Sequence, residues 1–288
     1  MLNVAFWNLG KNNCVGAVEE FAQLVASGAC GGTPSDAVIG FAEYQGVDWD
    51  ALCLKMGGAW THEKCSNRKF IIMTNAKSTL VETKETSYAV SKKVLIRRKA
   101  RALDAKEIII CFTHLPAPVG AWRPDNARHD SAEALKDHIM NSEKEWKNPD
   151  SIILGDLNMN PFDDAMVSGK GLNATMCREI ARRDTRKWKA GENQKETRFF
   201  YNPMWRLLGD RTSNNQPGTF YHSGDSSETL FWHCLDQVLL RPSLIDSLHQ
   251  KSPQIVTKLK SIDLLTAEGI INKNYSDHLP IKISLVFS

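Results

Sequence analysis

Short apolar runs rich in Val, Ile and Phe recur from one end of the chain to the other. Runs of this length, bounded by turn residues, are typical of strands that are buried on both faces of a sheet. The segments that fit this pattern are Val4–Trp7, Ala37–Phe41, Phe70–Met73, Glu107–Thr113, Ser151–Leu154, Leu235–Leu240 and Ile281–Phe287. We therefore predict a protein built around buried strands.

Helical spacing appears between some of these runs. Gly16–Ser27 carries Val18, Phe21, Leu24 and Val25 at the intervals of one helix face. The other segments predicted to be helical are Asn126–Trp146, Asp163–Ser168 and Ala174–Arg183. Strands buried on both faces and alternating with helices indicate a layered α/β arrangement.

The same pattern bears on domain organisation. Neither a Pro/Gly/Ser-rich linker nor an internal repeat interrupts the chain, so residues 1–288 are expected to form a single domain. Gly191–Gly218 is the least regular stretch, and its Asn, Arg and aromatic residues suit a surface excursion near a site.

Composition narrows the class of protein. With 288 residues, 42% of them apolar, the chain can bury a large core. It has no run near the roughly 18 apolar residues of a membrane span, and Met1–Trp7 lacks the basic start of a signal peptide. Its seven cysteines show no CxxC spacing, which argues against a zinc site or a disulfide framework. We expect a cytoplasmic protein with reduced thiols, in which Cys111 is a core residue.

The net charge of +3 neither requires nor excludes a polyanionic partner, but the basic residues are clustered. One run consists of Lys92, Lys93, Arg97, Arg98, Lys99 and Arg101, and another of Arg178, Arg182, Arg183, Arg186, Lys187 and Lys189. Such runs are able to follow a phosphate backbone. For each run taken alone, a solvated strand or helix face is the simpler interpretation.

Polar residues with catalytic chemistry follow the predicted strands. Ser151–Leu154 leads directly into Gly155-Asp156-Leu157-Asn158, a turn that places a carboxylate and an amide at the end of a strand. This pair suits the positioning of water beside a phosphate, although an Asx-turn that only caps the backbone is an equal alternative.

Other strand ends deliver further groups of the same kind. Asn8 ends the first run, and Glu43 follows Ala37–Phe41 as a hard oxygen ligand suited to Mg²⁺. His114 ends the run from Glu107 and is able to donate to a phosphate oxygen. Alone, each of these residues is more often an ordinary surface or structural group.

The last strands contribute an acid and an Asp-His pair. Asp236 opens a buried strand and needs a partner there, for which His278 is suitable because a carboxylate fixes the imidazole tautomer. Asp277 and His278 precede the final strand and are able to serve one metal or phosphate centre. Groups collected from several strand ends are how layered α/β enzymes build their sites.

The order Trp-Asn, Glu, Thr-His, Gly-Asp-x-Asn, Asp, Ser-Asp-His resembles the endonuclease/exonuclease/phosphatase superfamily, from Asn8 to His278. The resemblance implies a DNase I-like, four-layer α/β/β/α sandwich with its site at one rim. It also implies that Glu43 is the principal Mg²⁺ ligand, supported by Asn8 and Asp277, with Mn²⁺ as a substitute.

The resemblance also implies roles for the remaining groups. Asp156 and Asn158 orient the attacking water, and His114 binds a non-bridging oxygen. His278, braced by Asp236, acts either as general base or as donor to the transition-state oxyanion. The abasic-site endonuclease branch has an acid where this chain has Gly10, which weakens a repair function.

Further substrate contacts are expected from segments near these motifs. Tyr221 and Trp232 are the aromatic residues best suited to stack a base, although packing explains most aromatics in their segment. The polar candidates for substrate binding are Arg128, Arg198 and Asn202, with Asp125 and His129 similarly placed.

Three functions from different classes are compatible with these residues. The leading one is a nuclease on DNA or RNA, supported by the resemblance and the basic runs. The alternative is a phosphatase or phosphodiesterase for a small-molecule or lipid phosphate ester, with no membrane insertion and no obligate protein partner. A non-catalytic binding protein is disfavoured because every expected polar position is filled.

Overall fold

The computed structural model describes residues 1–12, 14–27, 35–57, 59–75, 78–96, 106–117, 125–212, 216–222 and 229–287. Two large sheets dominate this part of the chain. The first contains, in spatial order, β16 (Gln254–Ile255), β17 (Ile281–Leu285), β1 (Leu2–Asn8), β2 (Asp36–Ala42), β4 (Phe70–Asn75) and β3 (Trp60–Lys64). The second contains β5 (Ser78–Glu85), β6 (Ala89–Ile96), β7 (Lys106–His114), β8 (Ser151–Asp156), β15 (Asp236–Leu240), β12 (Phe200–Tyr201) and β9 (Ala174–Thr175).

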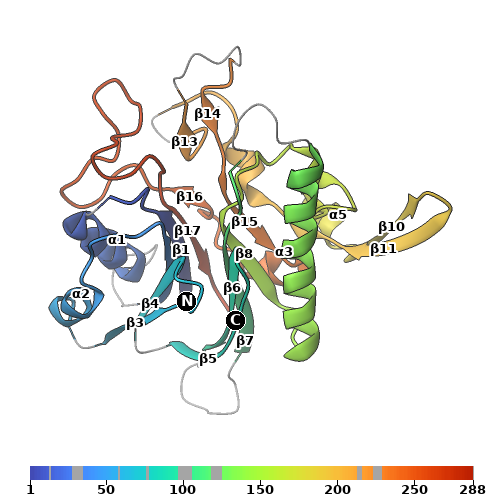
Figure 1. The fold of residues 1–288 in the computed structure, drawn as a ribbon, viewed down its shortest axis with the longest axis horizontal. Helices are drawn as coiled ribbons and strands as arrows, with labels where there is room; N and C mark the ends of the chain where they lie inside the picture. The colour runs from blue at the N-terminus through green and yellow to red at the C-terminus, as the bar shows by residue number, and fades with distance from the viewer. Residues whose placement is uncertain are drawn as a thin grey trace.

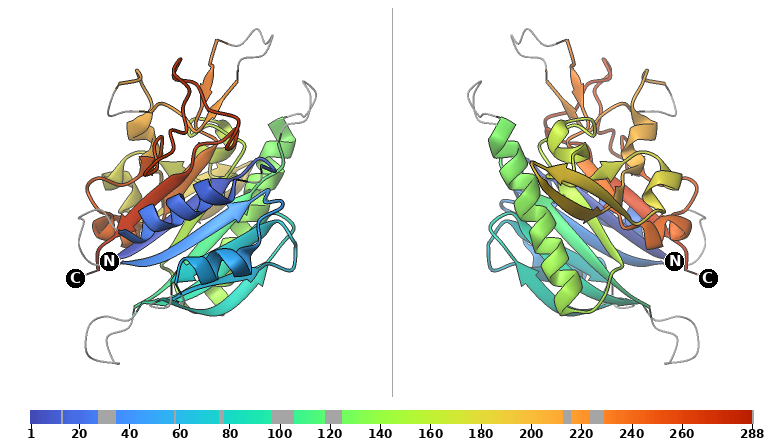
Figure 2. Two further views of the ribbon diagram at one scale, coloured as in Figure 1. Left: turned by 90° about the vertical axis from the view of Figure 1, so that its left-hand side faces the viewer. Right: turned by 90° about the vertical axis from the view of Figure 1, so that its right-hand side faces the viewer.

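Helices lie on the outer faces of both sheets. α1 (Val15–Ser27) and α2 (Trp49–Lys55) cover the first sheet, and α3 (Asp125–Glu145) covers the second, as views from the two sides show (Figure 2). Three buried apolar clusters fill the spaces between these layers. The order helix, sheet, sheet, helix (Figure 1) confirms the four-layer sandwich expected for the chain.

The core between the sheets explains why the strands are apolar on both faces. On β1, Val4 and Phe6 point into the cluster between the sheets, whereas Ala5 and Trp7 point toward α1. All four side chains are fully buried. Alternate residues of a central strand therefore enter two different cores, which is why the run shows no polar alternation.

Each predicted strand is present within a residue or two of its expected bounds, and Cys111 is fully buried on β7. The helices expected at Gly16–Ser27, Asn126–Trp146 and Asp163–Ser168 correspond to α1, α3 and α4 (Asp164–Val167). Among the described residues, none of the helices is long and apolar enough to cross a membrane.

The stretch Ala174–Arg183 differs from its prediction. Its first two residues form β9, which pairs with β12, and only Arg178–Ala181 is helical as α5. The open edge of the second sheet supplies backbone hydrogen-bonding groups for Ala174 and Thr175, and this long-range pairing overrides the local helical spacing.

The segment Gly191–Gly218 is also more regular than expected. Residues around its start form a projecting hairpin of β10 (Thr185–Ala190) and β11 (Asn193–Arg198), and Pro203–Leu207 is a 3₁₀ helix, η1 (Figure 1). The indole Nε1 of Trp188 donates to Oγ1 of Thr197 across the hairpin at 2.9 Å. Residues 213–215 lie outside the described part of the chain.

Strand directions bring the polar strand ends to one edge. β1 runs parallel to β2 and β7 runs parallel to β8, so their carboxyl ends meet in pairs. β17 is antiparallel to β1 and β15 is antiparallel to β8, so the amino ends of β15 and β17 lie at the same edges. We call this edge of the sandwich, where β1, β2, β7 and β8 end, the site rim.

Candidate active site

The two sheets meet at the site rim through side chains from different strands. Asn8, the last residue of β1, donates from Nδ2 to Oδ2 of Asp156, the last residue of β8, at 3.2 Å. His114, at the end of β7, lies with Nε2 3.4 Å from Oε1 of Glu43, which follows β2. Both contacts join the first sheet to the second, so these four strand ends form one constellation.

Asp156 stands at the centre of this constellation. It is 1% exposed, and its Oδ2 lies 3.6 Å from Nε2 of His114 as well as beside Asn8. Its Oδ1 accepts the backbone N–H of Asn158 at 2.9 Å, which is the Asx-turn that was the alternative interpretation. One carboxylate oxygen therefore shapes the turn while the other faces the neighbouring polar groups.

The backbone around Asp156 is unusually tight. Gly155 has φ of +154°, and a β carbon there would lie 1.9 Å from the carbonyl oxygen of Thr113 on β7. Asn158 has φ of +50°, and its Nδ2 donates to the carbonyl of Leu115 at 2.8 Å. Glycine allows β8 to approach β7 closely, and the amide of Asn158 ties the turn to the segment after His114.

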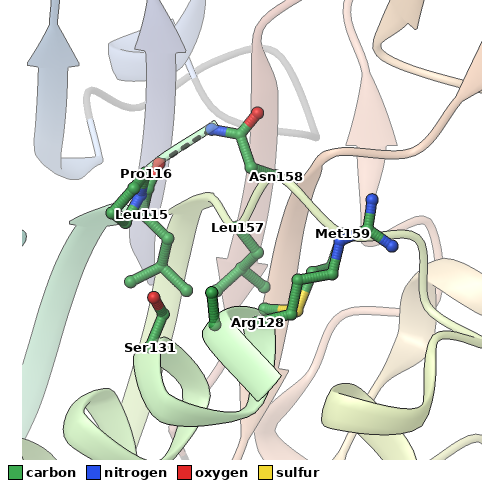
Figure 3. A pocket seen from close by; sticks show the side chains of 8 residues that line it. Leu115, Pro116, Arg128, Ser131, Leu157, Asn158 and Met159 are labelled. Carbon is green, nitrogen blue, oxygen red and sulfur yellow. Dashed lines mark hydrogen bonds between the residues drawn. The ribbon is translucent and has the colours of Figure 1, made fainter. Parts of the chain in front are cut away.

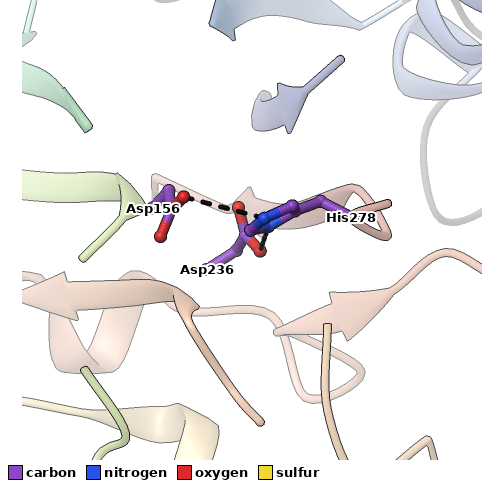
Figure 4. A group of neighbouring side chains, drawn as sticks. All are labelled: Asp156, Asp236 and His278. Carbon is purple, nitrogen blue, oxygen red and sulfur yellow. Dashed lines mark hydrogen bonds and ion pairs between the residues drawn. The ribbon is translucent and has the colours of Figure 1, made fainter. Parts of the chain in front are cut away.

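His278 and Asp236 form a hydrogen-bonded pair beside Asp156 (Figure 4). Nδ1 of His278 and Oδ2 of Asp236 are 2.7 Å apart, and Nε2 of His278 lies 3.8 Å from Oδ2 of Asp156. Both members of the pair are buried. The partnership of these two residues is thus as predicted from the sequence.

Burial opposes a charge on His278, but the carboxylates of Asp236 and Asp156 outweigh it and raise the pKa of His278 to about 10. The imidazole is therefore a cation at neutral pH in this arrangement. Because Nδ1 faces Asp236, Nε2 is the N–H that points toward Asp156. A charged N–H in this position suits donation to an anionic oxygen.

Two residues to which the sequence analysis gave no role, Thr219 and the Ser276 of the Ser-Asp-His motif, hold this pair in place. The hydroxyl of Thr219 accepts the backbone N–H of Asp236 at 3.0 Å, and its carbonyl accepts the N–H of Leu279 at 2.7 Å. Oγ of Ser276 donates to the carbonyl of Asn8 at 2.6 Å and accepts the N–H of His278 at 2.9 Å. Both side chains are buried, so the backbones that carry Asn8, Asp236 and His278 are bound together.

Comparison with solved structures gives the same architecture over the full chain. The catalytic domain of human Nocturnin matches 100% of this chain and 94% of its own, with 16% identity and a TM-score of 0.56. An endonuclease/exonuclease/phosphatase family protein from Bacteroides thetaiotaomicron covers 100% of this chain and 98% of its own, at 15% identity and a TM-score of 0.57. The 3′ phosphatase NExo from Neisseria covers 100% of both chains at 10% identity and a TM-score of 0.54.

The fold is that of the endonuclease/exonuclease/phosphatase superfamily. At these identities the likeness concerns the fold, and it agrees with the resemblance seen in the sequence motifs. No protein-family model and no curated protein matches this sequence.

Within this endonuclease/exonuclease/phosphatase fold, the oxygen donors suited to a hard cation are Glu43, Asn8 and Asp277. The Glu43 side chain is 30% exposed, which leaves room for water and for a substrate phosphate. Oδ1 of Asp277 is buried without a hydrogen-bond partner, so it lacks the compensation that a buried carboxylate oxygen requires. An unsatisfied carboxylate oxygen and an accessible carboxylate fit a divalent cation.

Asp156, Asp236 and His278 form a second set, with ligand atoms within 4.8 Å of one another. Oδ1 of Asp236 also has no hydrogen-bond partner. However, all three residues are buried, and Nδ1 of His278 is already paired with Asp236. Mg²⁺ prefers oxygen ligands and retains several waters, so the more open Glu43 side of the rim suits it better.

Gly10 marks the departure from the abasic-site endonuclease pattern. Its backbone has φ of +55°, and a β carbon there would lie 2.4 Å from Oδ1 of Asp277. The N–H of Gly10 donates to Oδ1 of Asn8 at 3.1 Å. A side chain at position 10 would therefore occupy the space that Oδ1 of Asp277 fills.

Arg128 lies next to the turn Gly155–Asn158, in a pocket formed between α3 and the segments after β7 and β8 (Figure 3). Leu115, Pro116, Asn158 and Met159 line the same pocket. The guanidinium is 39% exposed and lies 3.5 Å from Oδ2 of Asp163. The structure thus brings Arg128 together with Asn158 in one pocket, and a substrate contact by Arg128 stays a prediction.

Nearby, His129 pairs with Asp164 at 2.7 Å. The side chain of Asp125 lies outside what the structure describes.

The structure does not bring Arg198 to the site rim. Its guanidinium contacts Asp184 at 3.0 Å and Glu143 at 3.4 Å. Glu143 in turn accepts from Ser151, the first residue of β8, whereas Asp156 is the last residue of that strand. Arg198 therefore belongs to an ion-pair network at the opposite end of the strand.

Asn202 has a packing role in the structure. It is fully buried, its Oδ1 accepts the N–H of Met204 at the start of η1, and its Nδ2 donates to Oε1 of Gln237 at 2.8 Å. These bonds use both ends of the amide and leave none exposed for a substrate.

Tyr221 and Trp232 face each other in the hairpin formed by β13 (Phe220–Tyr221) and β14 (Trp232–His233), with ring centroids 5.0 Å apart. Both are half-buried and pack against the cluster beneath α1 and α2. Phe220, which the sequence did not single out, has its ring centroid 5.0 Å from that of His278. The hairpin is adjacent to the site through Phe220, and stacking by Tyr221 and Trp232 stays a prediction.

In the part of the chain that the structure describes, neither basic run forms a bare cationic surface at the site rim. Lys92 is buried and pairs with Glu63, and Lys93 contacts Glu82 and Glu107 at 3.3 and 3.2 Å. The other members of that run, Arg97, Arg98, Lys99 and Arg101, lie outside the described residues. The second run continues from α5 into the projecting β10, where Arg186, Lys187 and Lys189 are exposed.

Proposed function

We propose that this protein is a Mg²⁺-dependent phosphodiesterase that hydrolyses phosphodiester bonds, acting as an endo- or exonuclease on DNA or RNA. The convergence of Asn8, Glu43 and His114 with Asp156 and the His278–Asp236 pair at one rim carries this proposal. Phosphoester hydrolysis requires an acidic centre that holds a cation, a carboxylate that orients water and a charged group that stabilises the developing negative charge. The rim offers all three, with His278 as the charged group.

Glu43, Asn8 and Asp277 would hold the metal ion. When bound, Mg²⁺ supplies charge neutralisation at the scissile phosphate and lowers the pKa of a coordinated water. Mn²⁺ prefers the same oxygen ligands and is expected to substitute for it.

The remaining groups have complementary tasks in this proposal. Asp156 is a buried acceptor held by Asn8 and by the turn at Asn158, so it is positioned to orient the attacking water. His278, whose pKa lies well above neutral, donates from Nε2 to a developing phosphate oxygen, and Asp236 fixes its orientation. Of the two roles that the sequence left open for His278, this charge state favours the oxyanion donor.

The substrate is proposed from the similar structures and from the rim. The solved NExo structure contains a product DNA hairpin, and it shares this fold over the whole chain. Arg128 beside Asn158 is suited to a phosphate that flanks the scissile bond. The second candidate substrate is a small phosphate ester. Lys92 and Lys93 are ion-paired, and the basic β10–β11 hairpin projects away from the rim (Figure 1), so neither offers a cationic surface for a long polyanion at the site.

The test is hydrolysis of supercoiled plasmid, single-stranded DNA, RNA and bis(p-nitrophenyl) phosphate, with Mg²⁺ and with EDTA. We expect Glu43→Ala and His278→Ala to lower kcat by about a hundredfold or more, since each removes a group that stabilises transition-state charge. A nuclease cleaves the polymers, and its affinity falls steeply as salt is added. Hydrolysis of small esters alone would select the second candidate.

Two matched variants control for non-specific effects. Glu192→Ala removes an exposed carboxylate in the turn of the β10–β11 hairpin, and His249→Ala removes a histidine at the other end of β17. Both should retain wild-type rates. Full activity of Glu43→Ala, or activity that survives EDTA, would rule out the assigned metal centre.

A further inference from the structure

A second cavity, separate from the site rim, lies on the outer face of the first sheet at its β16 edge. It has a volume of about 400 Å³, which is within the usual range for small-molecule sites. Residues of α1, η1, β16 and β17 contribute to its wall. Lys282 of β17 is opposite Ala5 of β1, whose side chain points toward α1, so the cavity opens on the helix side of the sheet.

All of the charged residues that line this cavity are basic. Its cationic side chains are Arg206, Lys251, Lys258 and Lys282, and no Asp or Glu is present in the wall. A concave surface with several cations and low-dielectric walls concentrates anions. The cavity is therefore complementary to a negatively charged ligand.

The cations are also largely uncompensated. Arg206 donates to the carbonyls of Gln250 and Pro253 at 3.0 Å each, which positions the guanidinium without neutralising it. Lys258 contacts Asp263 at 3.3 Å, but both side chains are about two-thirds exposed, and such pairs are weak. Lys282 has no ion pair among the described residues, and burial lowers the pKa of its ammonium group. An anion in the cavity would relieve that cost.

Another part of the wall is apolar. Leu24 of α1, Leu207 of η1 and Ile255 of β16 line it, and each is partly buried. A site for inorganic phosphate alone has no need of an apolar surface. The combination matches a ligand with a phosphate at one end and a flat or apolar group at the other.

We propose that this cavity binds a small phosphorylated organic molecule of about nucleotide size, with its phosphate at Lys282 and Arg206 and its apolar part against Leu24, Leu207 and Ile255. The site is distinct from the catalytic one. Lys282 follows His278 by four positions, about 14 Å of extended chain at roughly 3.4 Å per residue, and lies on the outer face of the sheet.

The test is calorimetric titration with AMP, inorganic phosphate and adenosine in EDTA, so that hydrolysis and metal-dependent binding at the rim do not contribute. We expect AMP to bind more tightly than phosphate, and adenosine not to bind. Lys282→Met should weaken AMP binding by about tenfold or more, because it removes a charge-assisted hydrogen bond. Lys260→Ala, which removes an exposed lysine outside the cavity wall, is the matched control and should bind AMP normally.

A second pair of variants separates this proposal from the catalytic one. Glu43→Ala should keep full AMP affinity even though its hydrolytic activity is lost. Should Lys282→Met fail to fold by circular dichroism, the double variant Lys251→Ala, Lys258→Ala alters two exposed residues and should weaken binding instead. The proposal is overturned if AMP at millimolar concentration does not bind to the wild type. It is also overturned if Glu43→Ala abolishes AMP binding while the cavity variants leave it intact.

Discussion

Gly10 sets the space that is available to Asp277. Its positive φ disfavours any side chain, and a β carbon added to it would lie 2.4 Å from Oδ1 of Asp277. A methyl group at position 10 must therefore displace Oδ1 of Asp277. This oxygen belongs to the proposed metal centre and is buried without a hydrogen-bond partner, so the substitution is expected to weaken metal binding.

We expect Gly10→Ala to raise the Mg²⁺ concentration needed for half-maximal activity by about tenfold or more, because loss of a well-placed ligand group typically has this effect. The measurement is a Mg²⁺ titration of the hydrolysis rate. Gly57→Ala is the control, since Gly57 also has positive φ, of +83°, but has nothing within 4 Å of the added carbon. Equal Mg²⁺ dependence of both variants would contradict the placement of Asp277 at the metal.

Asn202 illustrates how a polar residue in a segment expected to face substrate can be structural instead. Its amide caps η1 and bonds to Gln237, whose Nε2 donates to the carbonyl of Met159, next to Asn158. These hydrogen bonds support the segment that follows the turn Gly155–Asn158 and do not reach into the site rim.

Asn202→Ala is expected to lower the free energy of unfolding by about 2 kcal/mol, because it leaves a buried Gln237 oxygen and a helix N–H unsatisfied. Urea unfolding measures this loss. The KM for any substrate should stay within about twofold of wild type. Asn193→Ala, on the exposed hairpin, should change neither quantity. A large rise in KM without loss of stability would restore a substrate-binding role.

At the scale of elements, α3 is held against the second sheet by a buried polar contact as well as by apolar packing. His138 of α3 lies with Nε2 2.9 Å from Oγ of Ser91 on β6, and both residues are buried. Burial, with a smaller repulsion from Lys84, lowers the pKa of His138 from 6.5 to about 4. The imidazole is therefore neutral in the folded protein at neutral pH.

This shift makes stability depend on pH in a defined direction. Below pH 6.5 His138 is protonated in the unfolded chain, whereas in the folded protein it stays neutral until about pH 4. The contribution of His138 to the free energy of unfolding is therefore complete above pH 6.5 and is lost as the pH falls toward 4. We expect the free energy of unfolding to fall between pH 7 and pH 4.5, and to fall by about 2 kcal/mol more in wild type than in His138→Gln. The glutamine keeps a hydrogen-bonding group but does not titrate. Urea unfolding at the two pH values tests this, and equal drops would contradict it.

The elements that sequence patterns misjudged are those at the edge of the second sheet. The spacing in Ala174–Arg183 favours a helix, yet Ala174 and Thr175 pair with Phe200 and Tyr201, about 25 residues away. The central strands were predicted well because burial on both faces leaves a continuous apolar signal that does not depend on the partner strand.

At the scale of the whole molecule, the site exists because two sheets end at the same level. Asn8 and Asp156 are 148 positions apart in sequence, and His278 and Asp236 are 42 apart. Local sequence identifies Asn8 and Asp156 as polar groups at the end of an apolar run, and Asp236 and His278 as polar groups at or before the start of one. The parallel and antiparallel order of the strands then brings them within hydrogen-bonding distance.

The sequence by itself determined seven of the strands and the residue types at their ends, because periodicity and turn chemistry are local. It also indicated His278 as the partner of Asp236, because a buried acid needs one and because the motifs resemble a known superfamily. Only the tertiary structure decided that Asn202 and Arg198 turn away from the rim, that Thr219, Ser276 and Phe220 support His278, and that four cations share a cavity beside α1. The physical reason is that side-chain direction and burial depend on contacts between distant segments, which no local pattern of residues encodes.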